Sequence, residues 1–588
     1  MIIKTVAIKG FRNFRDAVIN LSEKTLVIGS NDVGKSNLIY ALRILLDRSF
    51  SDIDIEPKKN DFYAYEETNE LSIRIYLANI SEECILAKLR ENISDSGESV
   101  IEYKAFFNPS TNQLSYKIFL GPDDQNMHEI ESRFYTKVLN LKFIGSRRDL
   151  SSFIRSEKQK LLDEARSGRA EKEINEDTAI LQEIENDLVH VNEKVIELNY
   201  VKTATTGINN QLSALSYHNQ TQDLAFDIGA SDPTSFISDL QLASKIKNQS
   251  VTVGGDGRNN QIHLALWSSR NKLLRDKKKN LLEVSIFCIE EPEAHLHPHQ
   301  QRKLASFLSE VLEGQVIITS HSPHIACEVP PSSIIRLYFH DNETSAAGDG
   351  INSSTEDEFI KFGYRLNVLA SEVFFSDVVF LVEGPSEILF YKAIANKVGV
   401  DLDRLNISLL MVDGIGFSPY SSLLKSLRIP FVIRTDNDVF KIPQQDRFRL
   451  AGFQRVIEII SQNFEIDEEM KKLLSQQHLL TGFNTNQPPE ATLLYCQKLR
   501  NKMKDLGMFL SEIDLENDIA SQMPTILAKY YGERVIDDSL INEMQKRKAT
   551  FMFDFLRNSI DGIENLESMP LIEPLIKCKE IAEGTYAN

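Results

Sequence analysis

Short apolar runs separated by helical patterns dominate the first half of the chain. Runs rich in β-branched residues occupy residues 2–8, 21–28, 284–289 and 316–318, and a helical pattern over residues 300–312 joins the last two. Two apolar runs linked in this way are typical of neighbouring parallel strands, whose carboxyl ends meet at one edge of a sheet. The pattern predicts an α/β fold whose functional residues directly follow the strands.

A second kind of strand is marked by alternation of apolar and polar residues. It occurs over residues 71–77, 100–107 and 114–120. Strands with one polar face are typical of antiparallel sheets, because such sheets can leave one face in water. We therefore predict an antiparallel lobe beside the parallel sheet.

A long polar helical pattern without proline runs from Ser151 to about Tyr200. Its apolar residues repeat every seven positions with a second offset series, and Asp177 is the polar gap in the stripe. This spacing predicts a helical hairpin or coiled-coil arm. Packing within one chain and contact with a second copy explain the stripe equally well. The stripe consists of Ile174, Leu181, Leu188 and Val195 with Ile184, Val191 and Leu198.

The α/β alternation restarts after a small, polar, acidic stretch that begins at Asp341. Apolar runs over residues 378–382, 407–412, 430–433 and 508–510 each lead into acidic residues. This restart predicts a second α/β domain joined to the first by a linker. The predicted domains are residues 1–150 with 206–340, an inserted arm at 151–205, a linker at 341–371 and a second domain at 372–588.

Composition narrows the class of protein. No apolar run in the 588 residues approaches the ~18–20 needed to cross a membrane, and the N-terminus lacks a signal-peptide pattern, so we expect a cytoplasmic protein. The five scattered cysteines favour reduced thiols over disulfides or a zinc site. The net charge of −19 argues against a DNA-coating role but is compatible with a nuclease that has a small basic patch. Arg147-Arg148 and residues 275–279 are candidates for such a patch.

A phosphate-binding loop follows the second apolar run. Residues 29–36 have the form G-x-x-x-x-G-K-S between a predicted strand and a predicted helix. Glycines let the backbone N–H groups face phosphate, the helix N-terminus adds a favourable dipole, and the lysine adds a charge. The serine is placed to ligate Mg²⁺. The candidate nucleotide-binding residues are Asn31, Asp32, Gly34, Lys35, Ser36 and Asn37.

Polar residues at two later strand ends suit the same nucleotide. Glu290 and Glu291 follow one predicted strand, and His321 follows its neighbour. Carboxylates and a histidine at one sheet edge can serve a nucleotide, its Mg²⁺ and an attacking water. A glycine-rich turn containing Gly255 and Gly257 opens another helical pattern, which suggests contact with the γ-phosphate from a partner subunit.

Carboxylates gather at the strand ends of the second domain. Two unit charges ~4 Å apart repel by about 1 kcal/mol in water and by more when buried, so such a cluster needs protons, basic partners or a hard cation. Few basic residues are interleaved, which favours Mg²⁺ or Mn²⁺. Two such ions could support phosphodiester cleavage. The candidate ligands are Glu383, Glu387, Asp436 and Asp438, with Asp514, Glu516 or Asp518 from a third strand end.

A cation must also offset the charge that develops on the phosphate. The late helical pattern over residues 542–556 contains Lys546 and Lys548. We choose Lys548 first and Lys546 second as the catalytic lysine, although surface lysines are more often simply solvated.

These motifs together resemble a known family. The segment from Glu290 to Pro298, the loop at residues 319–323 and the phosphate loop are similar to ABC-type ATPases of DNA repair and chromosome maintenance. The Glu383…Glu387 and Asp436-x-Asp438 pair resembles a Toprim domain. That order resembles the OLD-family (overcoming lysogenization defect) nucleases, including the large subunit of Gabija-type anti-phage systems.

The resemblance implies roles for particular residues. Arg12 and Asn13 would lie near the nucleotide, and Lys35 and Ser36 would bind it with Mg²⁺. Glu290 would be the Walker B acid, Glu291 the general base for ATP hydrolysis and His321 the γ-phosphate sensor. The acids of the Toprim domain would bind divalent metal for DNA nicking. Alternating histidines at 295, 297 and 299 could instead suggest zinc, but the family has histidines in this turn.

Three features depart from the family pattern. Glutamate stands at position 290 where aspartate is usual, residues 254–260 lack the Leu-Ser-Gly-Gly form, and no convincing Q-loop is present. These departures put efficient ATP turnover in doubt and favour nucleotide as a regulator.

We therefore expect an ATP-binding, metal-dependent endonuclease that nicks double-stranded DNA, in anti-phage defence or DNA repair. It should be a homodimer or higher homo-oligomer, and a helicase-type protein is the expected partner if it belongs to a two-component system. One alternative is a DNA-loading or scaffold protein of the recombination-mediator type. Strand passage or primer synthesis is another, but no catalytic-tyrosine motif is recognisable.

Overall fold

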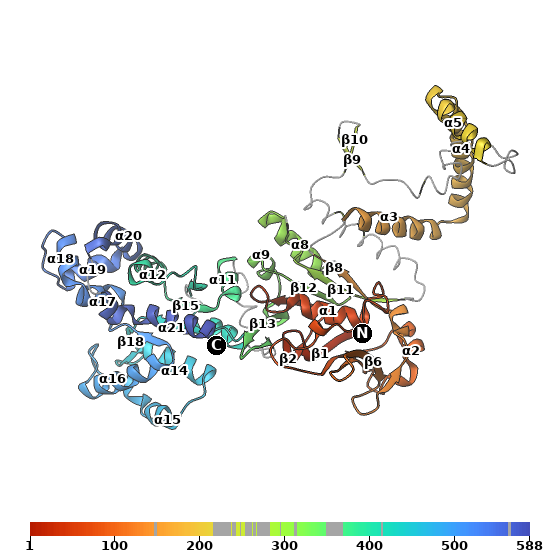
Figure 1. The fold of residues 1–588 in the computed structure, drawn as a ribbon. Coiled ribbons are helices and arrows are strands. Elements are labelled where there is room, and N and C mark those ends of the chain that lie inside the picture. The colour runs from red at the N-terminus through yellow and green to blue at the C-terminus, as the bar shows by residue number, and fades with distance from the viewer. Residues whose placement is uncertain are drawn as a thin grey trace. The chain divides into compact units, whose positions relative to one another are not determined.

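The computed structural model separates into two compact units, Met1–Ser146 with Leu282–Asn588, and Arg147–Leu281. Figure 1 shows the helices and strands of both units. The residues that the structure describes are 1–145, 150–215, 237, 243–246, 249–252, 262, 266, 283–294, 296–310, 314–348, 368–412, 416–562 and 566–587.

A six-stranded sheet forms the centre of the N-terminal domain. The predicted parallel pair is confirmed, because β11 and β12 pair in parallel with Glu290 opposite Thr319. Only β14, at one edge, runs antiparallel to its neighbour. The strand order is β14 (Glu343–Ala347), β13 (Ile334–His340), β3 (Lys24–Ile28), β12 (Val316–Thr319), β11 (Val284–Glu290) and β8 (Leu139–Ile144).

A second six-stranded sheet is antiparallel throughout, which confirms the predicted lobe. Helix α1 (Lys35–Leu46) contributes Leu38, Leu42 and Leu45, all fully buried, to a hydrophobic core shared with strands of both sheets. This shared core fixes the start of α1 against the sheet ends. The strand order is β2 (Phe14–Asn20), β1 (Ile2–Phe11), β4 (Glu70–Ala78), β5 (Ser99–Asn108), β6 (Gln113–Gly121) and β7 (His128–Ile130).

Shorter elements complete this domain. Helix α8 (Pro298–Glu310) lies between β11 and β12 in the chain, and α9 (Pro323–Ala326) follows β12. Helix α2 spans Glu83–Leu89. Strand β14 occupies residues that we assigned to the linker. Their small side chains suit an edge strand, and Thr344 is buried.

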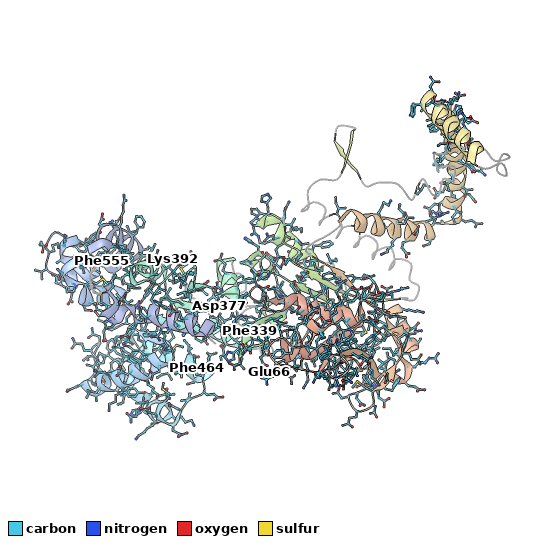
Figure 2. All side chains as sticks on the ribbon, in the orientation of Figure 1. Glu66, Phe339, Asp377, Lys392, Phe464 and Phe555 are labelled. Carbon is cyan, nitrogen blue, oxygen red and sulfur yellow. The ribbon has the colours of Figure 1, made fainter. Side chains whose placement is uncertain are left out.

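The C-terminal domain contains a four-stranded sheet of parallel strands. Every residue of β15 and β17 is buried, as expected for a parallel sheet covered on both faces. Helices α12 (Pro385–Ala395) and α21 (Glu573–Ala587) share a hydrophobic core with β15 and with Phe555, which Figure 2 labels. The strand order is β16 (Ile407–Met411), β15 (Val378–Val382), β17 (Phe431–Thr435) and β21 (Met508–Leu510).

A smaller lobe is inserted between β17 and β21. Its three-stranded sheet has the order β18 (Val439–Lys441), β19 (Phe448–Leu450), β20 (Thr481–Phe483). Helix α13 (Phe417–Ser426) precedes β17, and α14 (Ala451–Asn463), α15 (Glu468–Leu474) and α16 (Glu490–Asp505) belong to the lobe. The remaining helices include α11 (Val368–Glu372), α17 (Leu515–Gln522) and α18 (Pro524–Tyr530).

The predicted single helix over residues 542–556 is wrong in one respect. Two helices, α19 (Asp538–Lys546) and α20 (Lys548–Ser559), meet at Arg547, whose backbone (φ −133°, ψ 39°) is not helical. Lys548 therefore occupies the first position of a helix. Sequence periodicity did not reveal this break, because neither proline nor glycine marks it.

The inserted unit contains the predicted arm, as three helices in the described part: α3 (Leu150–Ser167), α4 (Glu171–Ile196) and α5 (Asn199–Leu215). No residue of α4 is fully buried. Leu181, Ile184, Leu188 and Val195 of its apolar stripe are half-buried, so the stripe is only partly covered within this unit. A short hairpin, β9 (Ala243–Ile246) with β10 (Gln249–Thr252), follows in the chain. The glycine turn with Gly255 and Gly257 and both candidate basic patches lie outside the described residues. In the part of the chain that the structure describes, no helix could cross a membrane.

Candidate functional site

The phosphate loop joins β3 to α1 in a conformation that needs glycine. Gly34 has φ 104°, and a Cβ there would lie 2.2 Å from Asn13 Nδ2. A Cβ on Gly29 would lie 2.5 Å from the carbonyl oxygen of Leu337. Both glycines are therefore required by positive φ and by close neighbours, which keeps the loop curled over the start of α1.

Lys35 is buried at the centre of this loop. Its Nζ donates to the carbonyl oxygens of Gly29 (2.9 Å) and Ser30 (2.7 Å). Burial lowers the pKa of Lys35 to about 8, against the opposing effect of nearby acids, among which Glu291 contributes most. The side chain is thus a poorly hydrated cation held by neutral acceptors, and a phosphate would be a better partner.

Glu290 lies beside the phosphate loop, and Glu291 lies near His321. Ser36 Oγ donates a short hydrogen bond to Glu290 Oε1, and His321 Nε2 lies 3.7 Å from Glu291 Oε1. Burial, followed by the charge of Lys35, lowers the pKa of His321. Ser36 at the start of α1 therefore lies at the same edge of the parallel sheet as Glu290, Glu291 and His321, which stand at the ends of β11 and β12.

Sequence reasoning missed the role of Glu293. This half-buried side chain accepts hydrogen bonds from Ser320 Oγ (2.8 Å) and from the backbone N–H of His321 (2.7 Å). Burial raises its pKa. It ties the turn after β11 to the loop after β12, so it positions His321. The sequence offered one signal for Glu293: it lies in the segment Glu290–Pro298, which resembles a motif of ABC-type ATPases.

Asn13 and Arg12 brace the phosphate loop. Asn13 is buried, donates to the carbonyl of Val33 (2.8 Å) and accepts from Asn37 Nδ2 (2.7 Å). Arg12 pairs with Asp61 (2.8 Å) and donates to Asn37 Oδ1 (2.9 Å). Asn13 thus contacts the loop and the start of α1, and Arg12 contacts the start of α1. Asn31 and Asp32 are exposed in the loop.

The second site is built at the ends of β15 and β17. Glu383 follows β15, and its Oε1 accepts from Thr435 Oγ1 (2.5 Å), from the backbone N–H of Asp436 (3.0 Å) and from Arg455 of α14. The carboxylates of Glu383 and Asp436 are therefore held at neighbouring strand ends. Sequence reasoning missed Arg455, because nothing in a surface helix distinguishes this arginine from its neighbours.

Arg434 is a buried cation beneath these carboxylates. It pairs with Asp518 (2.8 Å) and lies 3.9 Å from Glu387 and 4.0 Å from Asp436. An arginine inside an otherwise apolar, fully buried strand was the overlooked signal. Burial, followed by the charge of Glu383, raises the pKa of Asp436 to about 8 despite Arg434. Burial also raises the pKa values of Glu387 and Asp438.

Lys548 reaches the same cluster from α20. Its Nζ lies 3.4 Å from Glu516 Oε2, 3.7 Å from Asp436 Oδ2 and 3.9 Å from Asp514 Oδ2. Burial opposes the charged form, but these three carboxylates raise the pKa of Lys548 overall. Lys546 is exposed and, among the described residues, forms no ion pair with the cluster.

Comparison with known proteins assigns the two sites to different domains. Residues 1–144 and 122–326 match the AAA ATPase domain family. The chain belongs to this ATPase family. Residues 374–438 match the Toprim domain of proteins like the overcoming lysogenization defect protein. The ATPase domain thus carries the phosphate loop, and the Toprim domain carries Glu383, Asp436 and Asp438.

Two relatives match most of the chain. The chain is 25% identical to "Endonuclease GajA" of Bacillus cereus over 95% of each protein. It is 24% identical to "OLD nuclease" of Thermus scotoductus, over 75% of this chain and 83% of the relative. A crystal structure of the "SmcHead bound to the C-winged helix domain of ScpA" aligns with 59% of this chain and 97% of its own, with 16% identity and a TM-score of 0.36. The predicted α/β architecture and family are confirmed.

The Toprim carboxylates fit a divalent cation by their chemistry. Among the described residues, both carboxylate oxygens of fully buried Glu516 lack a hydrogen-bond partner, although Oε2 forms an ion pair with Lys548, and Nη1 of Arg434 also lacks one. Asp514, in contrast, caps α17 through Asn517 N (2.9 Å) and accepts from Gln545 (2.7 Å), and Asp518 is held by Arg434. Glu516 is therefore the third-strand acid best suited to a metal ion.

The carboxylates do not yet surround a common point. Among the described residues, no three Asp, Glu, His or Cys side chains are arranged to hold one metal ion. Arg434, Arg455 and Lys548 lie among them instead. A divalent ion would therefore have to compete with these cations and draw the carboxylates together. Of the alternating histidines, His299 accepts at Nδ1 from Arg302 (2.7 Å), and residue 295 lies outside the described part.

Proposed function

We propose that this protein is an ATP-binding, divalent-metal-dependent DNA endonuclease that nicks double-stranded DNA and is regulated by nucleotide, in anti-phage defence. The observation that carries the proposal is the assembly of Glu383, Asp436 and Glu516 with Lys548 at the strand ends of a Toprim domain. A scaffold protein without nuclease activity is not favoured, because the relatives that share the ATPase and Toprim domains are named nucleases.

The proposed cleavage site assigns distinct work to each side chain. Mg²⁺ or Mn²⁺ bound by Glu383, Glu387, Asp436, Asp438 and Glu516, with Asp514 in the neighbouring position, would activate water and stabilise the leaving oxygen, and two ions would suit this chemistry. Thr435, the Asp436 backbone and Arg455 hold Glu383 in one orientation. Lys548 would offset the charge that develops on the phosphate.

The proposed nucleotide site works through Lys35 and Ser36. Lys35 would exchange its two carbonyl acceptors for phosphate oxygens, and Ser36 with Glu290 would hold Mg²⁺. Glu291 and His321 are close enough to act together on an attacking water and the γ-phosphate. Glu290 replaces the usual aspartate, so we propose regulation of cutting as the main role of ATP or another nucleoside triphosphate.

The exposed stripe on α4 supports a homodimer or higher oligomer. Within the described residues of the arm, Ile174, Val191 and Leu198 are each more than two-fifths exposed. Apolar residues at heptad spacing are stable in water when a second helix covers them. We propose a cytoplasmic oligomer, with a helicase-type protein as partner. Analytical ultracentrifugation of a Leu181→Glu, Leu188→Glu variant should show smaller particles than the unchanged chain.

Plasmid nicking tests the proposed activity. The unchanged chain should convert supercoiled plasmid to the open-circular form in Mg²⁺ or Mn²⁺ but not in EDTA. Glu383→Gln and Asp436→Asn keep the shape of each side chain and remove its charge, so both should abolish nicking. Lys498→Ala, on the exposed surface of α16, is the matched control and should cut normally. Full cutting by either carboxylate variant would refute the site.

A further inference from the structure

A small hairpin projects from the carboxylate site. Strand β18 begins at the residue after Asp438, and β19 leads directly into α14, which carries Arg455. The backbone N–H of Ala451 donates to the Asp438 carbonyl (3.0 Å). A Cβ on Gly452 would lie 2.3 Å from the Asp436 carbonyl oxygen. The base of the hairpin is therefore packed directly on the Asp436–Asp438 turn.

One face of the hairpin carries an aromatic ring and two arginines. Phe440 is 48% exposed, and it is the direct cross-strand partner of Arg449. Directly opposed residues point to the same side of a hairpin. Arg447 lies two residues before Arg449, and its carbonyl accepts from Ile442 N (2.7 Å), so it continues on that side.

Arg447 and Arg449 are placed so that their charges can bind an external anion. Both are exposed, and within the described residues neither forms an ion pair with an acid; Arg449 contacts only Gln454, at 3.4 Å. Lys441 and Asp446 of the same hairpin pair with each other (2.8 Å). The hairpin therefore has a net positive charge in a chain with a formal net charge of −19. A site rich in carboxylates repels the phosphates of DNA, so cations beside it are needed for binding.

We infer that this face of the β18–β19 hairpin binds the DNA strand to be cut, next to the scissile phosphate. Arg447 and Arg449 each pair with a backbone phosphate, and Phe440 packs against a neighbouring base or sugar. Arginine suits phosphate through its planar fork of donors, and an exposed aromatic ring suits any base regardless of sequence. The inference rests on the proposed nuclease function and adds the surface that positions its substrate.

Equilibrium binding measured by fluorescence anisotropy tests the inference without cutting. Full-length protein in EDTA is titrated into a labelled duplex and a labelled single strand at several salt concentrations. Each phosphate contact adds about 0.9 to the slope of log K against log salt. Arg447→Ala with Arg449→Ala should therefore weaken binding and flatten the slope by about 1.8. Phe440→Ala should weaken binding by about tenfold, mainly to the single strand, and leave the slope unchanged.

Two controls separate the outcomes. Lys472→Ala with Lys498→Ala removes the same charge from exposed positions on α15 and α16 and should keep the slope of the unchanged chain. Calorimetric Mn²⁺ binding and the thermal unfolding midpoint should be the same for all variants. The proposed hairpin surface is refuted if the arginine and lysine double variants lose DNA affinity equally. It is also refuted if the arginine double variant keeps the salt slope of the unchanged chain. If the unchanged chain bound no DNA, this result would refute the proposed nuclease function and, with it, the hairpin surface.

Discussion

The two candidate sites bury ionisable groups of opposite sign. In the ATPase domain a buried lysine lies among backbone carbonyls, and the pKa of Lys35 falls to about 8. In the Toprim domain buried carboxylates lie together, and the pKa of Asp436 rises to about 8. Burial destabilises the charged form in both cases. Each site therefore holds a charge that an ion of opposite sign, phosphate or a divalent cation, would stabilise.

The two sites also differ in how their charge is compensated. Lys35 is surrounded by acids of its own site, Glu290, Glu291 and Glu293, which partly support its charge. The Toprim carboxylates depend on three cations from three elements: Arg434 of β17, Arg455 of α14 and Lys548 of α20. The first site is thus prepared by acids at the ends of neighbouring strands of one sheet, whereas the second is prepared by ion pairs to cations on three separate elements. Each prediction below tests this difference.

The largest effect should come from removing the buried cation of the Toprim site. Arg434→Met leaves Asp518, Glu387 and Asp436 buried without their partner, and loss of one member of a buried pair costs about 3–5 kcal/mol. Urea unfolding followed by circular dichroism should show this loss in the Toprim domain. Arg434→Met combined with Asp518→Asn should recover part of the stability. An unchanged free energy of unfolding would show that Arg434 does not compensate these acids.

Removal of the ATPase-site cation should be milder and confined to ligand binding. Lys35→Ala loses a charged contact to phosphate, so nucleotide affinity should fall by at least about tenfold, which equals 1.4 kcal/mol. Calorimetric titration with a non-hydrolysable nucleotide measures this change, and Mn²⁺ binding to the Toprim site should stay as in the unchanged chain. Equal nucleotide affinity in variant and parent would remove Lys35 from the site.

The pH dependence of the two sites should have opposite signs. Asp436, with its raised pKa of about 8, must release a proton to bind a cation, so metal affinity should increase as pH rises toward 8, by up to about tenfold per pH unit. Lys35 loses its charge above about pH 8, so nucleotide affinity should decrease there. Titrations of Mn²⁺ and nucleotide at pH 6, 7, 8 and 9 measure both. Asp436→Asn should remove most of the rise, and parallel trends would contradict the comparison.

We expect the smallest effect on cutting from Arg455, a residue of the smaller lobe that donates to Glu383. Arg455→Met removes one of three donors to Glu383 and also a competing positive charge. We expect cutting to fall several-fold while Mn²⁺ affinity stays equal or rises slightly. Arg455→Lys should restore part of the cutting. A fall in cutting matched by an equal fall in metal affinity would instead show that Arg455 is needed to assemble the metal ligands.

The amino-acid sequence by itself determined the sites that depend on contiguous residues. The phosphate loop is specified by residues 29–36, because glycine at fixed spacing sets the backbone and the next helix follows at once. Apolar runs ending in acids likewise predicted β15 and β17 and the acids that follow them. These features are local, so periodicity and turn chemistry suffice to find them.

Only the tertiary structure decided how distant residues pair. Glu516 and Asp518 look equivalent in sequence, yet Arg434 takes Asp518 and Lys548 approaches Glu516. Lys548 lies in the cluster and Lys546 does not, because helix α19 ends at Lys546 and a new helix, α20, begins at Lys548. Such ion pairs join residues separated by up to 112 positions (Asp436 and Lys548), and no local pattern encodes which of several similar charges will be buried together.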